Sequence, residues 1–106
     1  MKQSIEFIEL IYELTNKFPS DECFGLISQL RRASVSVSSN IAEGSARKYN
    51  KERSRFYEMA RSSLVEIDTQ LIIAMKLNFV EYKSIKSVES LLERLFAMST
   101  QLIRKT

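Results

Sequence analysis

Apolar residues recur every three or four positions through most of the chain, which is the period of a helix with one buried face. The first such segment covers about residues 2–17. Ile5, Ile8, Tyr12 and Thr15 fall at helical spacing, and the predicted apolar face is broadened by Phe7, Ile11, Leu14 and Phe18. Pro19 ends the segment, because proline disfavours helical backbone in the residue before it and supplies no N–H donor.

The second segment, about 21–43, begins after Ser20, which can cap a helix, and is predicted to end at Gly44 in the left-handed conformation. Its seam steps by four and three residues in turn, through Leu26, Leu30, Ala33, Val37 and Asn40. The run from Ser34 to Ser38 alternates with period two, as a strand would. The helical period continues through this run in phase and no turn residues bound it, so we predict helix throughout.

Two longer helices are predicted to follow, one over about 51–77 that is capped by Asn50 and ended by Asn78, and one over about 82–104. The third seam is Phe56, Ala60, Ser63, Ile67, Leu71 and Ala74, and the fourth is Ile85, Val88, Leu92, Leu95, Met98 or Ser99, and Leu102. Two glycines and one proline are too few for the turns of an all-β protein. Four helices with short connections predict an all-α fold, an antiparallel up-down-up-down four-helix bundle, in a single domain of residues 1–106.

The residue inventory argues against an enzyme. The chain has no histidine, a single cysteine and no glycine-rich loop, so we expect no catalytic site, no metal site and no cofactor. Cys23 lies in the first turn of the second predicted helix, where a thiol can be activated, but a small buried hydrophobe is the favoured interpretation. A lone thiol predicts a cytoplasmic protein, and the longest apolar run, Leu71 to Met75, is far too short to span a membrane.

Charge is distributed unevenly along the chain. The formal charge is +3 overall, yet residues 31–61 contain eight basic residues against three acidic ones, which leaves +5 there and −2 elsewhere. We predict that these eight side chains contact the phosphates of RNA or DNA: Arg31, Arg32, Arg47, Lys48, Lys51, Arg53, Arg55 and Arg61. Tyr57 stands between Arg53 and Arg61 at helical spacing and is a candidate for stacking on a base. For this motif taken alone, a solvated face with Tyr57 half-buried is the favoured interpretation.

Other features point to structure and assembly. Asn40 falls on a core seam, where an amide is costly unless hydrogen-bonded, so we predict a structural polar cluster of Asn40 and Glu43, joined by Arg32 or Arg47. The first helix has an acidic stripe that could meet the basic surface of a neighbouring subunit, at Glu6, Glu9 and Glu13. A surplus of aromatic side chains favours a homo-oligomer over a monomer: Phe7, Phe18, Phe79 and Phe96.

Two motifs in the second helix carry a family resemblance, Gln29-Leu30-Arg31-Arg32-Ala33 and Asn40-Ile41-Ala42-Glu43-Gly44. Together with Phe24-Gly25-Leu26 and Thr69-Gln70-Leu71, they closely resemble the four-helix-bundle proteins encoded in intervening sequences of 23S rRNA genes, a family that includes the accessory variability determinant of diversity-generating retroelements. The resemblance covers nearly the whole chain. It implies an up-down bundle that assembles as a homopentameric ring and, in the retroelement branch, a basic surface that engages nucleic acid and a reverse transcriptase.

The sequence also departs from the family pattern. Many members place Pro at the position of Ser38 and Gly at that of Ser62, and the missing Pro predicts a straighter second helix. Members usually have a longer aromatic-rich lead-in, within which this chain begins. The leading hypothesis is a non-enzymatic, oligomeric nucleic-acid-binding or ribonucleoprotein accessory protein. The alternative is a protein-protein adaptor whose charges serve assembly and docking.

Overall fold

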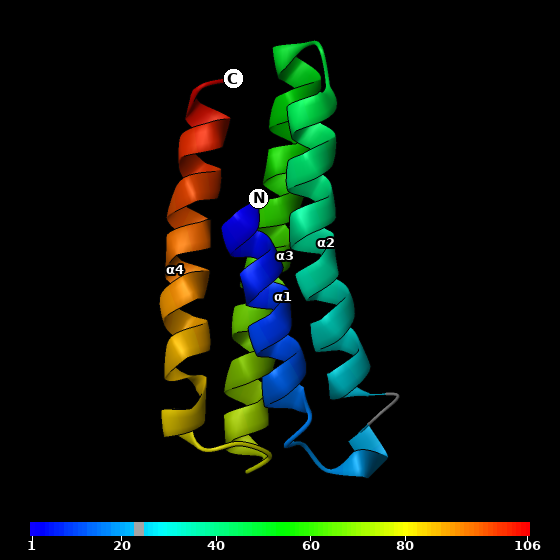
Figure 1. Ribbon diagram of the computed structural model, residues 1–106, viewed down its shortest axis with the longest axis vertical. Helices are drawn as coiled ribbons and strands as arrows, with labels where there is room; N and C mark the ends of the chain where they lie inside the picture. Colours follow the sequence, from blue (N-terminus) through cyan, green and yellow to red (C-terminus); the bar gives the residue numbers. More distant parts are fainter. Residues whose placement is uncertain (23–24) are drawn as a thin grey trace.

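The computed structural model describes residues 1–22 and 25–106, which form four α-helices joined by short connections (Figure 1). The helices are α1 (Lys2–Thr15), α2 (Leu26–Ala46), α3 (Asn50–Lys76) and α4 (Tyr82–Arg104), and a 3₁₀ helix, η1 (Ser20–Glu22), lies between α1 and α2. These residues contain no strand, so the predicted all-α fold with four helices is confirmed. The ribbon is compatible with the predicted antiparallel up-down order, because each connection starts the next helix at the end where the last one finished.

Each helix packs on two neighbours. α2 packs on α1 and most extensively on α3, while α4 closes the arrangement by packing on α1 and α3. The helices differ in length: α1 has 14 residues and α3 has 27, which at 1.5 Å per residue correspond to roughly 21 and 40 Å. The connection between α2 and α3 therefore projects well beyond the start of α1, as the green ribbons show at the top of Figure 1.

The core is a continuous cluster of apolar side chains from all four α-helices. Its most completely buried members include Phe7, Ile11, Leu30, Val37, Leu64, Ile67, Leu71, Ile85, Val88 and Leu95. Most of those on α2, α3 and α4 lie on the predicted seams. In α3, however, Tyr57 and Leu64 are buried, whereas the predicted seam residues Phe56 and Ser63 are only half-buried. Burial of each such side chain contributes about 1.5–3 kcal/mol before the entropic cost of ordering it, so the seams decide how the helices face one another.

Only part of the apolar face predicted for the first helix lies in the core. Ile5 and Tyr12 are 48% and 40% exposed, whereas Phe7, Ile11 and Thr15 are buried. Both stripes are apolar at helical spacing, and the helix turns toward the core the stripe with Phe7, whose ring carries no polar group, and leaves the Tyr12 hydroxyl outside. Phe18 is also buried, so Phe7 and Phe18 are not surplus apolar surface for an oligomer contact.

The C-terminal ends of α3 and α2 have different backbone conformations. Beyond α3, Asn78 takes a left-handed conformation (φ 59°), its N–H donates to the Met75 carbonyl over 3.0 Å, and the Phe79 N–H donates to the Ala74 carbonyl over 2.9 Å. This paired pattern is the Schellman motif, and it confirms the predicted end at Asn78. The predicted end at Gly44 was wrong, because α2 continues to Ala46 and Gly44 does not have positive φ.

Gly44 serves close packing instead of helix termination. A Cβ atom at this position would lie 2.6 Å from Cε1 of Tyr57 and 3.2 Å from the Arg53 carbonyl oxygen. Only a residue without a side chain lets α2 and α3 approach this closely.

The helix starts also shift from their predicted positions. α2 begins at Leu26 and not near Asp21, which belongs to η1, and α3 begins at Asn50 with Tyr49 as its N-cap. Cys23 and the predictions made for it lie outside the described residues. None of the helices in residues 1–22 and 25–106 combines the length and the hydropathy needed to cross a membrane.

Candidate nucleic-acid interface

The eight predicted phosphate contacts do not form one patch. Arg31 and Arg32 lie near the start of α2, whereas Arg47 follows its last residue. Sixteen positions of helix separate Arg31 from Arg47, a distance of roughly 24 Å along the axis. Arg61 lies ten positions beyond Lys51 on α3, or roughly 15 Å away. The cations therefore divide into groups with different surroundings.

Arg31 is engaged inside the fold. Its Nε donates to Thr15 Oγ1 over 2.9 Å and its Nη2 donates to Asn16 Oδ1, also over 2.9 Å. The guanidinium carbon lies 4.5 Å from the centroid of the Tyr12 ring, within the range of a cation–π contact. These contacts fasten the end of α1 to α2 and occupy the Nε–Nη2 edge of the guanidinium, one of the edges that could bind a phosphate through two hydrogen bonds. Arg32, its neighbour, is exposed.

The predicted stacking role of Tyr57 was wrong. Its side chain is 2% exposed and packs against Gly44, and its hydroxyl lies 3.2 Å from Ser45 Oγ. The two arginines beside it are both half-buried. Arg53 has a buried Nε without a hydrogen-bond partner, and the Arg61 guanidinium carbon lies 5.8 Å from the Phe96 ring centroid. This set therefore joins α3 to its neighbours and does not present an aromatic ring to a ligand.

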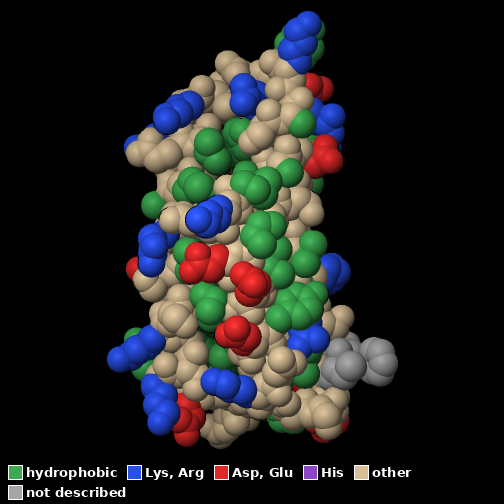
Figure 2. Space-filling model, in the orientation of Figure 1, with side chains coloured by type: hydrophobic (Ala, Val, Ile, Leu, Met, Phe, Trp, Pro, Cys, Tyr) green, Lys and Arg blue, Asp and Glu red, His purple; other side chains and the backbone are tan. Residues whose placement is uncertain are grey.

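Three exposed cations of the predicted set lie together with one tyrosine at the end of the molecule where α2 turns into α3. We call this group the hairpin tip and define it as Arg47, Lys48, Tyr49 and Lys51, all of them exposed. Figure 2 shows basic side chains projecting from this end of the surface. Arg55 is also exposed and lies one helical turn below Lys51 on α3.

Tyr49 is the aromatic residue that the sequence reasoning missed. Its side chain is 64% exposed, and the Lys48 ammonium lies 5.7 Å from its ring centroid. The signal was present in the sequence, because Tyr49 lies in the predicted polar connection and outside every apolar seam. An exposed tyrosine beside a lysine has the composition of a stacking platform for a base.

Arg47 is partly engaged at the tip. Its Nη2 lies 2.6 Å from Glu43 Oε2, and its guanidinium carbon is 4.7 Å from the Phe56 ring centroid. Both members of the ion pair remain substantially exposed, at 41% for Arg47 and 53% for Glu43. Exposed pairs of this kind contribute about 0–1 kcal/mol, so a phosphate can replace Glu43 as the partner at little cost.

The predicted polar cluster of Asn40 and Glu43 does not form as one unit. Asn40 is half-buried, and its Nδ2 donates to the carbonyl oxygen and to Oγ of Ser36, over 2.9 and 3.0 Å. Glu43 pairs with Arg47 and Arg32 joins neither, within the described residues. The helix directs Val37 and Ile41 into the core, which leaves Asn40 at its edge.

Acidic side chains lie on a different part of the surface. Glu6, Glu9 and Glu13 are all exposed on α1, and Figure 2 shows a group of acidic side chains among apolar ones on the face where that helix lies. In the described part of the chain no ion pair joins them to a basic residue. The acidic stripe and the hairpin tip are therefore separate surfaces of opposite charge.

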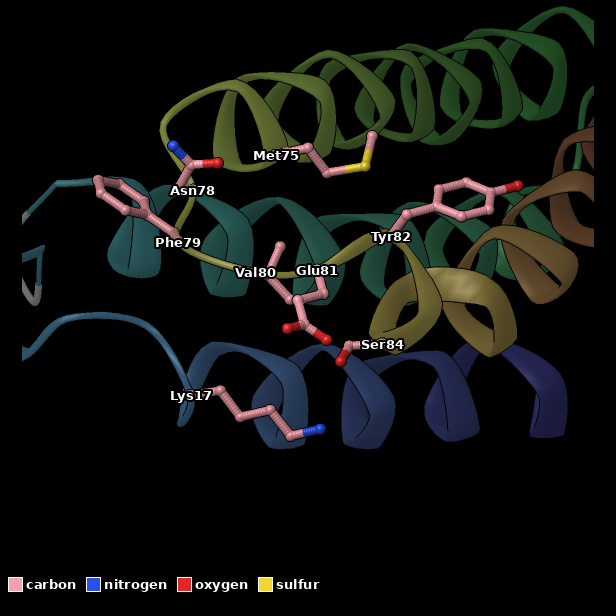
Figure 3. Close-up of a pocket in the computed structure, with 8 residues that line it drawn as sticks. All are labelled: Lys17, Met75, Asn78, Phe79, Val80, Glu81, Tyr82 and Ser84. Carbon is pink, nitrogen blue, oxygen red and sulfur yellow. The ribbon is translucent and has the colours of Figure 1, made fainter.

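A cavity at the opposite end of the molecule contains none of the predicted site residues (Figure 3). It has a volume of about 720 Å³ and lies where α3 turns into α4. Its lining consists of Lys17, Met75, Asn78, Phe79, Val80, Glu81, Tyr82 and Ser84. Across residues 1–22 and 25–106, His, Cys, Asp and Glu side chains do not gather in any group of three or more that could hold a metal ion.

The structure is that of an all-α protein with four helices, which carries an exposed aromatic residue among cations at one helix connection. The family model for the 23S rRNA-intervening sequence protein matches residues 1–101. The chain therefore belongs to that family, and the resemblance carried by its motifs is confirmed. No curated protein matches it.

The motif residues that carried the resemblance have contacts inside the fold. Gln70 Nε2 on α3 donates to Gln29 Oε1 on α2 over 3.2 Å, Arg31 fastens α1, and Gly44 admits the Tyr57 ring. The two motifs of α2 thus connect that helix to both of its neighbours. They account for the family's fold more directly than for any contact with a partner.

Proposed function

We propose that this protein is a non-enzymatic nucleic-acid-binding protein that holds a single strand at the hairpin tip, on an antiparallel up-down bundle. The observation that carries the proposal is Tyr49, an aromatic ring 64% exposed at the end of the molecule, with Lys48 against its face. An aromatic ring among cations offers a face on which a base can stack and charges that attract phosphates, so this arrangement favours a nucleic-acid strand as the partner.

The tip supplies the two interactions that single strands require. Lys48 and Lys51 are exposed ammonium groups outside the ion pairs of the described residues, so both can contact phosphates without breaking an ion pair. Arg47 adds a planar guanidinium that binds phosphate through two parallel hydrogen bonds once it leaves Glu43. A base stacked on Tyr49 then lies between these phosphate contacts.

Charge reversal at the two ends of the molecule tests the proposal. Lys48→Glu with Lys51→Glu changes the tip, and Lys83→Glu with Lys86→Glu changes the start of α4; each pair lowers the formal charge from +3 to −1. Fluorescence anisotropy with a short single strand is expected to show at least a tenfold loss for the tip variant and a much smaller loss for the matched control. Since each phosphate contact contributes about 0.7 to the salt slope for single strands, the tip variant should also lower that slope by about 1.4.

The stacking interaction has its own matched control. Tyr82 is 58% exposed at the other end and lies 5.9 Å from the Lys86 ammonium, so its surroundings resemble those of Tyr49. Tyr49→Ala is expected to weaken binding about 5- to 150-fold, the range that corresponds to about 1–3 kcal/mol of base stacking. Equal losses in Tyr49→Ala and Tyr82→Ala would contradict a specific role of the tip.

A second candidate function is self-assembly or docking to another protein through the outer surface of α3. Five aliphatic side chains of this helix are between 42% and 55% exposed: Met59, Val65, Ile72, Ile73 and Leu77. Val65 and Ile72 are one heptad apart, which places them on one face. The proposal includes assembly into a homo-oligomer, and the family resemblance implies a ring of five subunits.

Light scattering tests the assembly. A particle several times the chain mass of 12.3 kDa is expected, and Val65→Glu with Ile72→Glu should reduce it toward that mass. A wild-type particle of about 12 kDa would contradict assembly. An oligomer that fails to retard RNA or DNA at low salt would favour the adaptor over the nucleic-acid-binding protein.

A further inference from the structure

A polar groove leads away from the hairpin tip along the junction of α2 and α3. It is open to solvent, has a volume of about 400 Å³, and is lined by Ser36, Asn40, Arg55, Glu58, Met59, Ser62 and Ser63. Arg55 belongs both to this lining and to the basic end of α3, one turn or roughly 6 Å below Lys51. A strand held at the tip and running along α3 would therefore enter the groove.

The groove offers mainly hydrogen-bond acceptors. Asn40 uses its Nδ2 on Ser36, which leaves its carbonyl oxygen without a partner among the described residues. Glu58 is exposed and lies outside the ion pairs described for the chain, so its carboxylate is a second acceptor. The Ser62 hydroxyl is exposed and makes no side-chain hydrogen bond in the described residues, whereas Ser63 and Ser36 are engaged with each other over 3.1 Å.

These acceptors match a hydroxyl and oppose a phosphate. A phosphodiester has no proton to donate and is repelled by the Glu58 carboxylate, whereas a ribose 2′-hydroxyl can donate to a carboxylate or to an amide oxygen. Deoxyribose lacks that hydroxyl. The cation in the lining is Arg55, at the edge of the groove nearer to the tip, and the Ser62 hydroxyl can donate as well as accept.

We propose that the α2–α3 groove reads the 2′-hydroxyl groups of a strand anchored at the tip, so that the protein prefers single-stranded RNA to DNA of the same sequence. This inference rests on the proposed function of the tip. The tip supplies affinity for either nucleic acid through phosphates and a base, and the groove supplies the difference between the two.

The test compares three fluorescent strands of one sequence, in RNA, in DNA and in RNA carrying 2′-fluoro groups. 2′-Fluoro RNA retains an RNA-like sugar conformation but cannot donate a hydrogen bond from the 2′ position. Wild-type protein is expected to bind RNA about three- to tenfold more tightly than DNA, close to the net contribution of one typical hydrogen bond, and to bind 2′-fluoro RNA as it binds DNA.

The groove variant is Glu58→Ala with Ser62→Ala, which removes two of the three acceptors and should move the ratio of RNA to DNA affinity toward one. The control variant, Glu93→Ala with Ser90→Ala on α4, makes the same change of charge and hydroxyl content outside the groove and should keep the wild-type ratio. The ratio is the measurement, because the loss of a negative charge raises affinity for both strands.

The outcomes separate the two proposals. RNA and DNA affinities within twofold of each other in the wild type would overturn the groove inference, and so would 2′-fluoro RNA that binds as tightly as RNA. The tip proposal would stand in both cases if Lys48→Glu with Lys51→Glu weakened binding of both RNA and DNA. Absence of wild-type binding to every strand at low salt would overturn the tip proposal and the groove inference together.

Discussion

Replacing Gly44 by alanine tests the closest approach in the fold, because two effects of opposite sign compete at this position. Gly44 lies inside α2, where glycine is about 0.5–1 kcal/mol less stable than alanine. On propensity alone, Gly44→Ala would therefore stabilise the protein. The added methyl group, however, would begin 2.6 Å from Cε1 and 2.9 Å from Cδ1 of Tyr57.

The surroundings decide which effect is larger. Tyr57 is 2% exposed, so its ring has no open space into which it can move, and the other near atom is the carbonyl oxygen of Arg53, which belongs to the backbone of α3. Overpacking of a core typically costs about 1–3 kcal/mol. After the propensity gain is subtracted, we expect Gly44→Ala to lower the free energy of unfolding by about 1–2 kcal/mol.

Urea unfolding followed by circular dichroism measures the change, with Ser39→Ala as the control. Ser39 is exposed in the same helix, so its replacement reports the effect of alanine without the clash and is expected to be neutral or slightly stabilising. In a Tyr57→Leu background, the smaller side chain should leave room for the methyl group. Gly44→Ala should then become neutral or stabilising, and the double-mutant cycle would assign the cost to this one contact.

A single result would refute this reasoning. If Gly44→Ala raised the free energy of unfolding by about 0.5–1 kcal/mol, the helix propensity alone would describe the position and the close approach of α2 and α3 would not be a constraint. A loss that persisted unchanged with Tyr57→Leu would instead place the strain at the Arg53 carbonyl.

Three further predictions concern single residues that hold the helices, each measured by denaturant unfolding. Arg31→Ala should lower the free energy of unfolding by about 1–3 kcal/mol, because Thr15 and the end of α1 lose a charged donor. Arg31→Lys should recover only part of this stability. Equal stability of the wild type and Arg31→Ala would contradict the proposed role of Arg31 in fastening α1 to α2. Asn78→Val should cost about 1–2 kcal/mol at φ 59° and Asn78→Gly should cost nothing, so the reverse order would refute the Schellman assignment. Gln70→Met should be neutral or stabilising by up to about 1 kcal/mol, since it removes a buried Oε1 without a partner and loses only the hydrogen bond to Gln29. A loss above about 2 kcal/mol would show that this hydrogen bond is essential.

Much of the fold could be predicted from the spacing of apolar residues, because burial acts on every turn of a helix. The seams of α2, α3 and α4 contain Leu30, Ile67 and Leu95, which are all fully buried. The same reasoning was only partly right for α1, where Ile5 and Phe7 begin two apolar stripes of similar strength. Periodicity detects a face, but it cannot choose between two faces that are both apolar.

Gly44 shows a different limit of sequence reasoning. A glycine near the end of a helical pattern has two physical uses, a left-handed turn or a close approach to another helix, and both need the absence of a side chain. Which use applies depends on what packs opposite, and Tyr57 lies thirteen positions away on the next helix. The residues around Gly44 do not indicate that Tyr57 packs against it, so the prediction assigned the commoner role, a left-handed helix end.

The candidate site depended on the same kind of information. Arg31 and Lys48 are equivalent in a count of charges, but Arg31 lies where the end of α1 offers Thr15 and Asn16 as acceptors, and Lys48 lies beyond the reach of that helix. α1 is short, and the connection of α2 to α3 extends past its start, so the cations there meet few groups of their own chain. The length of α1 thus separates the arginine that holds the fold from the lysine that remains free for a partner. A binding surface is predictable in this protein only once the acceptors that the fold provides have been assigned to their donors.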